Sequence, residues 1–134
     1  MSLQKLDIYN VRNIREQSIT PSPALNFIYG KNASGKSALI EAIFLLGRAK
    51  SFRTSSIKPV ISFEQDNLIV SAHVLQGKSS SLQLGIQMDG KNIEIRINQQ
   101  PSQKRSDLAY ALPLQIIHPK SFELLDAGAQ IRRE

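Results

Sequence analysis

The residues with the clearest chemical meaning in this sequence form a glycine-rich run at positions 30–37. The pattern G-x-x-x-x-G-K-[ST] is matched in full by Gly30, Lys31, Asn32, Ala33, Ser34, Gly35, Lys36 and Ser37. Gly30 and Gly35 let the backbone turn so that several N–H groups face one small anionic space. Lys36 can reach β- and γ-phosphates, and the Ser37 hydroxyl can complete the shell of a Mg²⁺ ion. The run therefore predicts a loop that binds a nucleoside triphosphate.

A phosphate-binding loop needs a strand before it and a helix after it, and the flanking residues predict both. Residues 25–29 form a short apolar run bounded upstream by Pro21 and Pro23, which predicts a buried strand. Residues 38–46 are apolar nearly all round, which predicts a buried helix, and Gly47 is expected to end it. The positive end of this helix would then face the phosphates.

Length and composition limit the class of protein. The chain has 134 residues, a size typical of one domain, with an ordinary apolar content of 41%. It has no cysteine, which excludes disulfides and cysteine-based metal sites. The first residues carry no apolar signal segment and the apolar run after the loop is too short to span a membrane, so we expect a cytoplasmic protein without a membrane partner.

The net charge of +6 is unevenly distributed along the chain. Residues 1–60 hold nine Lys and Arg but three Asp and Glu, whereas residues 61–134 hold eight of each. No acid lies between Glu41 and Glu64, a stretch that contains Arg48, Lys50, Arg53 and Lys58. These four residues are candidate DNA contacts, because a basic surface attracts a polyanion. The alternative is a solvated loop whose charges help to attract the triphosphate.

The second half of the chain changes to a period of two. Residues 68–74, 82–88 and 93–97 alternate apolar with polar side chains, Asp89-Gly90 predicts a tight hairpin, and residues 77–80 predict a looser turn. An antiparallel meander of this kind has one apolar face. The residues expected to be buried on it are Leu68, Val70, Leu84, Ile86, Ile93 and Ile95. Small P-loop kinases and Ras-like GTPases would continue in β/α units instead, and no Asn-Lys-x-Asp guanine-reading stretch is present.

Several segments together resemble the RecF family of bacterial DNA-repair ATPases, which is related to the heads of structural-maintenance-of-chromosomes (SMC) proteins. They are Val11-Arg12-Asn13-Ile14, the loop at 30–37, residues 47–53, Leu112-Pro113-Leu114-Gln115-Ile116-Ile117-His118-Pro119 and Arg132-Arg133. The likeness covers nearly the whole chain and corresponds to the N-terminal part of the family. The chain departs from the family at Val11, where Phe is usual, and near Lys120, where an acid is common.

The resemblance implies an α/β fold, the N-terminal lobe of an ABC/SMC-like P-loop head with the meander inserted after the loop helix. We expect one lobe over 1–134, with a P-loop core at 1–60 and 108–134 and a β subdomain at about 61–100. One sheet would hold the strand before the loop, and the meander would form a second. Residues 103–112 and 121–127 are expected to be helices, and 114–117 a buried strand.

The resemblance also implies function. Arg12 and Asn13 would lie beside the phosphates of ATP; otherwise Arg12 is a solvated charge at a strand end. The cofactors would be ATP and Mg²⁺. The partners would be DNA, either single-stranded or at junctions of single and double strands, a second copy in an ATP-dependent homodimer of the full-length protein, and other recombination-mediator proteins. The processes would be DNA replication, DNA repair and the SOS response. The alternatives are a nucleotide-binding cassette of another ABC-type ATPase, or a self-standing P-loop enzyme. Adenine is preferred over guanine only by the resemblance.

Two features of a complete ABC-type ATPase are missing from the sequence: a Ser-Gly-rich signature loop and a strand ending in acidic residues. His73 and His118 are expected to be structural. We therefore assign no catalytic residue and expect the chain alone to bind ATP without hydrolysing it. If it did hydrolyse ATP, the acids to test first would be Glu41, Glu64 and Asp126.

Overall fold

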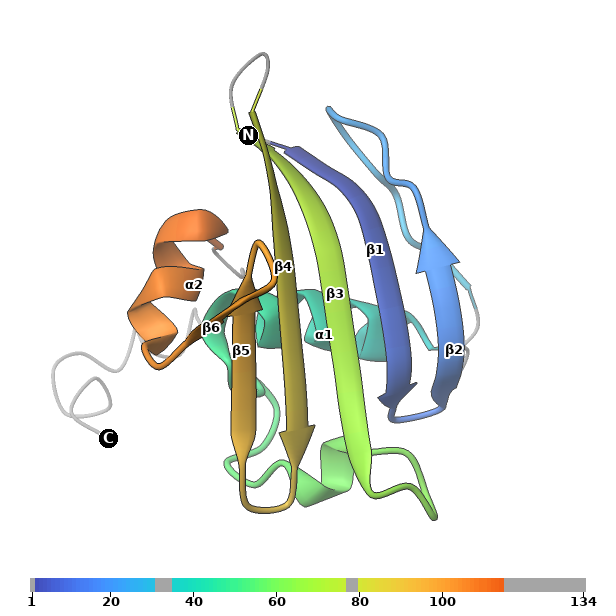
Figure 1. Cartoon of the computed structure of the whole chain (residues 1–134). Coiled ribbons are helices and arrows are strands. Elements are labelled where there is room, and N and C mark those ends of the chain that lie inside the picture. The colour runs from blue at the N-terminus through green and yellow to red at the C-terminus, as the bar shows by residue number, and fades with distance from the viewer. Residues whose placement is uncertain (1, 31–34, 77–79, 115–134) are drawn as a thin grey trace, which may run out of the picture.

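The fold is built on one antiparallel sheet with a helix across one face. The computed structural model describes residues 2–30, 35–76 and 80–114. The helices and strands in chain order are β1 (Ser2–Val11), β2 (Ile14–Ile19), α1 (Lys36–Arg48), the 3₁₀ helix η1 (Lys58–Val60), β3 (Asn67–Gln76), β4 (Ser80–Asp89), β5 (Ile93–Ile97), β6 (Gln100–Ser102) and α2 (Arg105–Ala111). Figure 1 shows α1 running across the back of the sheet and α2 beside β5 and β6.

The described strands form a single six-stranded sheet in the order β2-β1-β3-β4-β5-β6. The prediction of two separate sheets was wrong for this part of the chain, because the residues before the loop add no strand and the sheet of the meander also takes in β1 and β2. The apolar positions explain the pairing. Leu6 lies opposite Ala72 and Ile8 opposite Val70, so both strands turn their apolar side chains to the same face. A shift of one residue would turn every apolar side chain to the opposite face.

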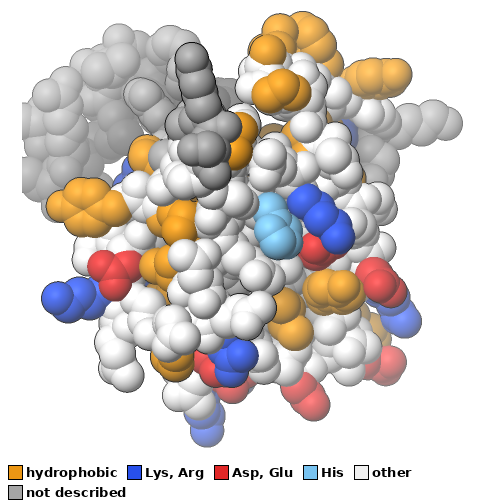
Figure 2. Space-filling model, turned by 45° about the horizontal axis from the view of Figure 1, so that its top comes forward, with side chains coloured by type: hydrophobic (Ala, Val, Ile, Leu, Met, Phe, Trp, Pro, Cys, Tyr) orange, Lys and Arg blue, Asp and Glu red, His pale blue; other side chains and the backbone are white. Residues whose placement is uncertain are grey.

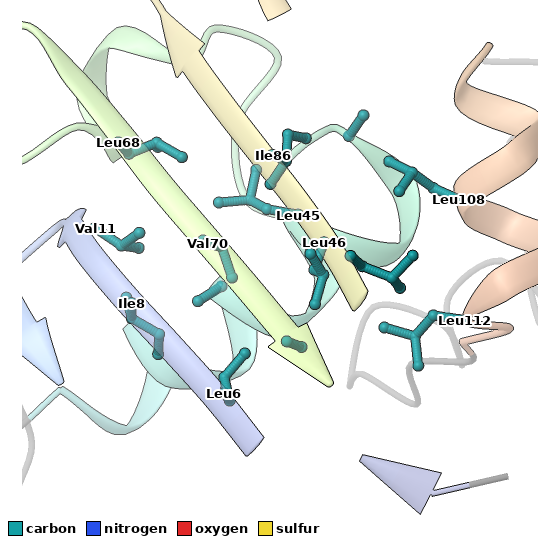
Figure 3. Close-up of a cluster of buried hydrophobic side chains, with 14 of the residues drawn as sticks. Leu6, Ile8, Val11, Leu45, Leu46, Leu68, Val70, Ile86, Leu108 and Leu112 are labelled. Carbon is teal, nitrogen blue, oxygen red and sulfur yellow. The ribbon is translucent and has the colours of Figure 1, made fainter. Parts of the chain in front are cut away.

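The predicted apolar face of the meander is confirmed. Its central residues are buried in the same hydrophobic cluster as Leu45 and Leu46 of α1, namely Leu68, Val70, Leu84, Ile86 and Ile95, while Ile93 is half-buried. Figure 3 shows Leu68, Val70 and Ile86 in this cluster with Leu45 and Leu46. The hairpin after β4 is also confirmed, since Asp89 Oδ1 accepts hydrogen bonds from the backbone N–H groups of Lys91 and Asn92 at 2.7 and 2.6 Å. Most of the turn predicted at 77–80 lies outside the described residues.

Helix α1 confirms the predicted helix, but Gly47 does not end it. The helix continues to Arg48 and stops at Ala49, which has the left-handed φ of 56° and donates its N–H to Leu45 O at 2.7 Å. Gly47 is buried inside the last turn, and a β-carbon there would overlap the side chain of Leu114. The glycine is needed for close packing of the segment that follows α2, rather than for a helix stop.

The strand predicted at residues 25–29 was also wrong. These residues form no strand, and three of their large side chains are exposed: Leu25 to 68%, Phe27 to 81% and Tyr29 to 90%. Two hydrogen bonds between Ser22 and Asn26 hold the segment locally. The physical reason is that an apolar run becomes a strand only beside a partner strand, and no strand of the described residues pairs with it.

The remaining elements agree in part with the prediction. Helix α2 confirms the short helix expected at 103–112, and its Leu108 packs against α1. The strand expected at 114–117 and the helix at 121–127 lie, apart from position 114, outside the described residues. Strands β2 and β6 were not predicted, because they are short edge strands without an apolar alternation. No described helix is long and apolar enough to cross a membrane.

Replacing Leu84 with Ala removes a fully buried side chain from the middle of the sheet. We expect the free energy of unfolding to fall by about 2–5 kcal/mol, because a cavity remains. Leu25→Ala is the matched control, and it should change stability by less than about 0.5 kcal/mol because Leu25 is exposed. Urea titration followed by circular dichroism measures both. Equal losses would mean that the core is wrongly assigned.

Candidate nucleotide-binding site

Helix α1 begins directly after Gly35 of the glycine-rich loop. Gly35 has φ 97° and ψ 4°, a left-handed conformation that side-chain-bearing residues rarely adopt. Its carbonyl accepts the first helical hydrogen bond, from Leu39 N at 2.9 Å. The N–H groups of the first helical turn have no partner within the helix, so they present positive charge at this end. Residues 31–34 lie outside the described residues.

A cavity of about 490 Å³ lies at this helix end, lined by Arg12, Asn13, Gly35, Lys36, Ser37, Ala38 and Arg53. Five of the predicted nucleotide contacts are therefore brought together from two distant parts of the chain. Lys36 Nζ donates to Gly30 O at 2.6 Å, so this ammonium group links the two described ends of the loop. Arg53, which the sequence suggested as a DNA contact, also lies on this cavity.

Arg12 is held in place by its backbone as well as its side chain. It sits in the tight turn between β1 and β2 with a left-handed φ of 53°. Its N–H donates to Val60 O at 2.7 Å, and its carbonyl accepts from Ser62 Oγ at 2.6 Å. The neighbouring Asn13 side chain reaches the loop, because its amide atoms lie 3.6 Å from where a β-carbon of Gly35 would be. The turn is thereby packed against the phosphate loop.

The Arg12 side chain forms a bidentate ion pair with Glu41 of α1. Nε donates to Oε1 at 2.7 Å and Nη2 donates to Oε2 at 3.1 Å. The Glu41 side chain is fully buried, and that of Arg12 is only 22% exposed. Arg12 is therefore not a solvated charge at a strand end. Arg12 also lines the cavity, and three of its five N–H donors remain unused by Glu41.

A third group completes the surroundings of Glu41. The Ser51 hydroxyl donates a hydrogen bond to Oε2 of the same carboxylate. Ser51 Oγ in turn accepts from the backbone N–H groups of Arg53 and Thr54, at 3.0 and 3.3 Å. From the sequence alone, Glu41 was a candidate only for the acid that activates water. The available signal was a lone carboxylate in an otherwise apolar helix, which requires a charged partner when it is buried.

The partners of Glu41 decide its charge. Burial alone would raise its pKa, but hydrogen bonds from Arg12 and Ser51 and the positive charges of Arg12 and Arg53 together lower the pKa below its usual value. The hydrogen bond to Glu41 raises the pKa of Arg12 and outweighs the opposing effect of burial. Both groups are therefore ionised at neutral pH, and the site keeps a fixed ion pair beneath the cavity.

The other candidates from the sequence lie away from this cavity. Arg48 donates to Leu114 O at 2.7 Å, Lys50 lines a separate cavity of about 280 Å³, and the Lys58 side chain lies against Gly90. Glu64 is exposed. His73 is half-buried in β3, opposite Lys5 and Gln83.

His118 and Asp126 are outside the described residues, among which no group of three or more His, Asp or Glu gathers to hold a metal. Figure 2 shows both signs of charge mixed on the face that it presents.

Stability should depend on pH through Glu41. Its folded pKa lies below the ordinary value of 4.5, so the ion pair stabilises the fold fully above about pH 4.5 and loses this effect as pH falls through the folded pKa. We expect Glu41→Gln to cost about 3 kcal/mol near neutral pH and much less in acid. Urea unfolding across this range measures the difference.

The matched control for that experiment is Glu94→Gln. Glu94 also pairs with an arginine, Arg96 at 3.0 Å, but both side chains are exposed. Its replacement should cost less than about 1 kcal/mol at neutral pH. A Glu41→Gln cost as small as this one, or one that does not shrink in acid, would contradict the role assigned to the buried pair.

Comparison with known proteins shows the family to which the chain belongs. A family model described as the RecF/RecN/SMC N-terminal domain matches residues 2–123. DNA replication and repair protein RecF of Pseudomonas syringae pv. syringae (strain B728a) is 42% identical over 100% of this chain and 37% of its own length. That of Stutzerimonas stutzeri (strain A1501) is 42% identical over 100% of this chain and 36% of its own length. The chain thus spans little more than a third of these relatives.

Two solved structures have the same fold as this chain. The recombination mediator protein RecF-ATP of the RecFOR pathway superposes with a TM-score of 0.83 and 27% identity, over 90% of this chain and 34% of that one. RecF-ATPrS superposes with a TM-score of 0.88 and 27% identity, over 98% and 36%. The predicted P-loop ATPase fold and the resemblance to the N-terminal part of RecF are confirmed. The chain belongs to the RecF/RecN/SMC N-terminal domain family.

Proposed function

We propose that this chain is the ATP-binding part of a RecF-like DNA-repair ATPase. The observation that carries the proposal is the cavity at the N-terminus of α1, which the turn at Arg12 and Asn13 closes from the sheet side. The solved relatives described as RecF-ATP and RecF-ATPrS support ATP as the ligand. Its anionic phosphates suit a space lined by Arg12, Lys36 and Arg53.

Each group has a distinct task in this proposal. The backbone N–H groups at the start of α1 donate to phosphate oxygens. Lys36 exchanges its hydrogen bond to Gly30 O for a phosphate oxygen, which is a stronger, charge-assisted partner. Arg12 adds the donors that Glu41 leaves unused. The exposed Ser37 hydroxyl on the cavity wall fits a ligand of Mg²⁺, which would neutralise phosphate charge when bound.

We further propose that residues 1–134 form one N-terminal lobe whose chemistry is completed by a C-terminal part with the signature loop and acidic strand. The curated relatives, which are nearly three times as long, support this. The exposed apolar residues Leu25, Phe27 and Tyr29 support it as well, because they lead directly into the loop and have no cover among the described residues. In such a protein, two ATP-bound copies would join around the nucleotides.

DNA and other recombination-mediator proteins are the proposed partners, in a cytoplasmic protein. The relatives' names support a role in DNA replication and repair, and the excess of positive charge in residues 1–60 suits a polyanion. Arg48, Lys50 and Lys58 remain the proposed DNA contacts. Arg53 lines the cavity at the N-terminus of α1, which we call the phosphate cavity. We therefore propose Arg53 as a nucleotide contact in place of a DNA contact.

Replacing Lys36 with Ala should weaken ATP binding by roughly 10- to 100-fold, because a charge-assisted hydrogen bond to phosphate is lost. Isothermal titration calorimetry measures the affinity, and circular dichroism checks that the fold is kept. Lys91→Ala is the control: it removes the same charge from an exposed position that does not line the phosphate cavity. Equal ATP affinity of Lys36→Ala and the unaltered chain would reject the assignment.

The 134-residue chain should bind ATP without steady turnover. Phosphoryl transfer relies on positioning and charge stabilisation, and it also needs a group that orients water. Glu41 does not supply that group, because its oxygens already accept from Arg12 and Ser51. Release of phosphate is the measurement. Turnover that disappears in Lys36→Ala would overturn this prediction, and would direct the search to Glu64 and Asp126.

A further inference from the structure

We infer that Glu41 is a positioning residue that orients Arg12 and, through Ser51, Arg53 toward the same phosphate cavity. The inference rests on the proposed function, since it assumes that the cavity receives nucleotide phosphates. It adds that the turn at residues 51–54 supplies Arg53 to the nucleotide site, and that this turn is held by a carboxylate that does not itself line the cavity.

The geometry of the ion pair fixes the direction of the first arginine. A guanidinium has five N–H donors in a rigid planar fork. Glu41 engages one donor at Nε and one at Nη2, at 2.7 and 3.1 Å. Three donors of Arg12 remain, on the parts of the group that the carboxylate does not cover. Because Arg12 lines the cavity, these are the donors available to an anion there.

The second arginine depends on the same carboxylate through one hydroxyl. Ser51 Oγ donates to Glu41 and accepts from Arg53 N and Thr54 N, which makes it the centre of a small turn. Phe52 anchors this turn to α1, with its ring 5.5 Å from that of Phe44 in an edge-to-face contact. The turn therefore holds Arg53 at the wall of the cavity.

The charges make the arrangement useful for an anion. Arg12 and Arg53 repel one another, and Glu41 lies where both positive charges act on it. Lys36 and the N-terminus of α1 add further positive charge to the cavity. One buried carboxylate thus stabilises two arginines that line the same cavity, and it does not line that cavity itself. An apolar residue at this position would suit the rest of the helix face but would leave both arginines without an anchor.

Ser51→Ala tests the inference without leaving Glu41 unpaired. Calorimetry should show ATP affinity weakened by roughly three- to tenfold, because Arg53 is no longer held at the cavity. Ser51→Thr, which keeps the hydroxyl, should retain the affinity. Ser56→Ala is the matched control on the same loop, since Ser56 is exposed and does not line the phosphate cavity, and it should bind ATP as the unaltered chain does.

A double-mutant cycle separates positioning from stability. If Ser51 acts through Arg53, then Ser51→Ala should have little further effect on ATP affinity once Arg53 is replaced by Ala. A merely structural role would lower the free energy of unfolding and leave the affinity of the folded protein unchanged. Unchanged affinity in Ser51→Ala, or full additivity with Arg53→Ala, would overturn the inference alone. No ATP binding by the unaltered chain would overturn the proposed function and the inference together.

Discussion

The ion pair between Arg12 and Glu41 is the interaction on which the rest of the site depends. Elsewhere, α1 and the sheet are joined by apolar side chains such as Ile8, Leu45 and Val70. At the cavity, an apolar contact would provide neither hydrogen-bond donors nor positive charge, and the proposed phosphate ligand needs both. The bidentate pair replaces it there, joining the β1–β2 turn to the helix while leaving three guanidinium donors of a cavity-lining residue unused.

The same pair explains why a charge is tolerated inside an apolar helix. A buried carboxylate without partners would raise its pKa and become neutral. Arg12 and Ser51 satisfy both oxygens of Glu41, so it remains ionised and can bind the two segments that flank the cavity. Such a pair contributes little net stability compared with apolar packing, but it specifies geometry. In a site proposed to bind a polyanion, geometry is the more important contribution.

Features with a local pattern could be predicted from the sequence, and features that depend on distant contacts could not. Helix α1, the meander and α2 follow from periodicity within one segment. The pairing of β1 with β3 joins residues sixty or more positions apart, and nothing in either strand alone specifies it. Arg12 was placed at the phosphates by family resemblance, whereas its partner Glu41 and the role of Ser51 appear only in three dimensions.

The wrong prediction of a strand at residues 25–29 has a clear physical cause. The short apolar run at residues 25–29 is a pattern for a strand, but a strand needs hydrogen-bonding neighbours for its backbone groups. Here the pattern is present without the neighbours, and the side chains are exposed. The segment runs directly into Gly30, so a strand added beside it would lie next to the phosphate loop. A strand added beside β6 would instead lie at the far edge of the sheet from β1 and its turn.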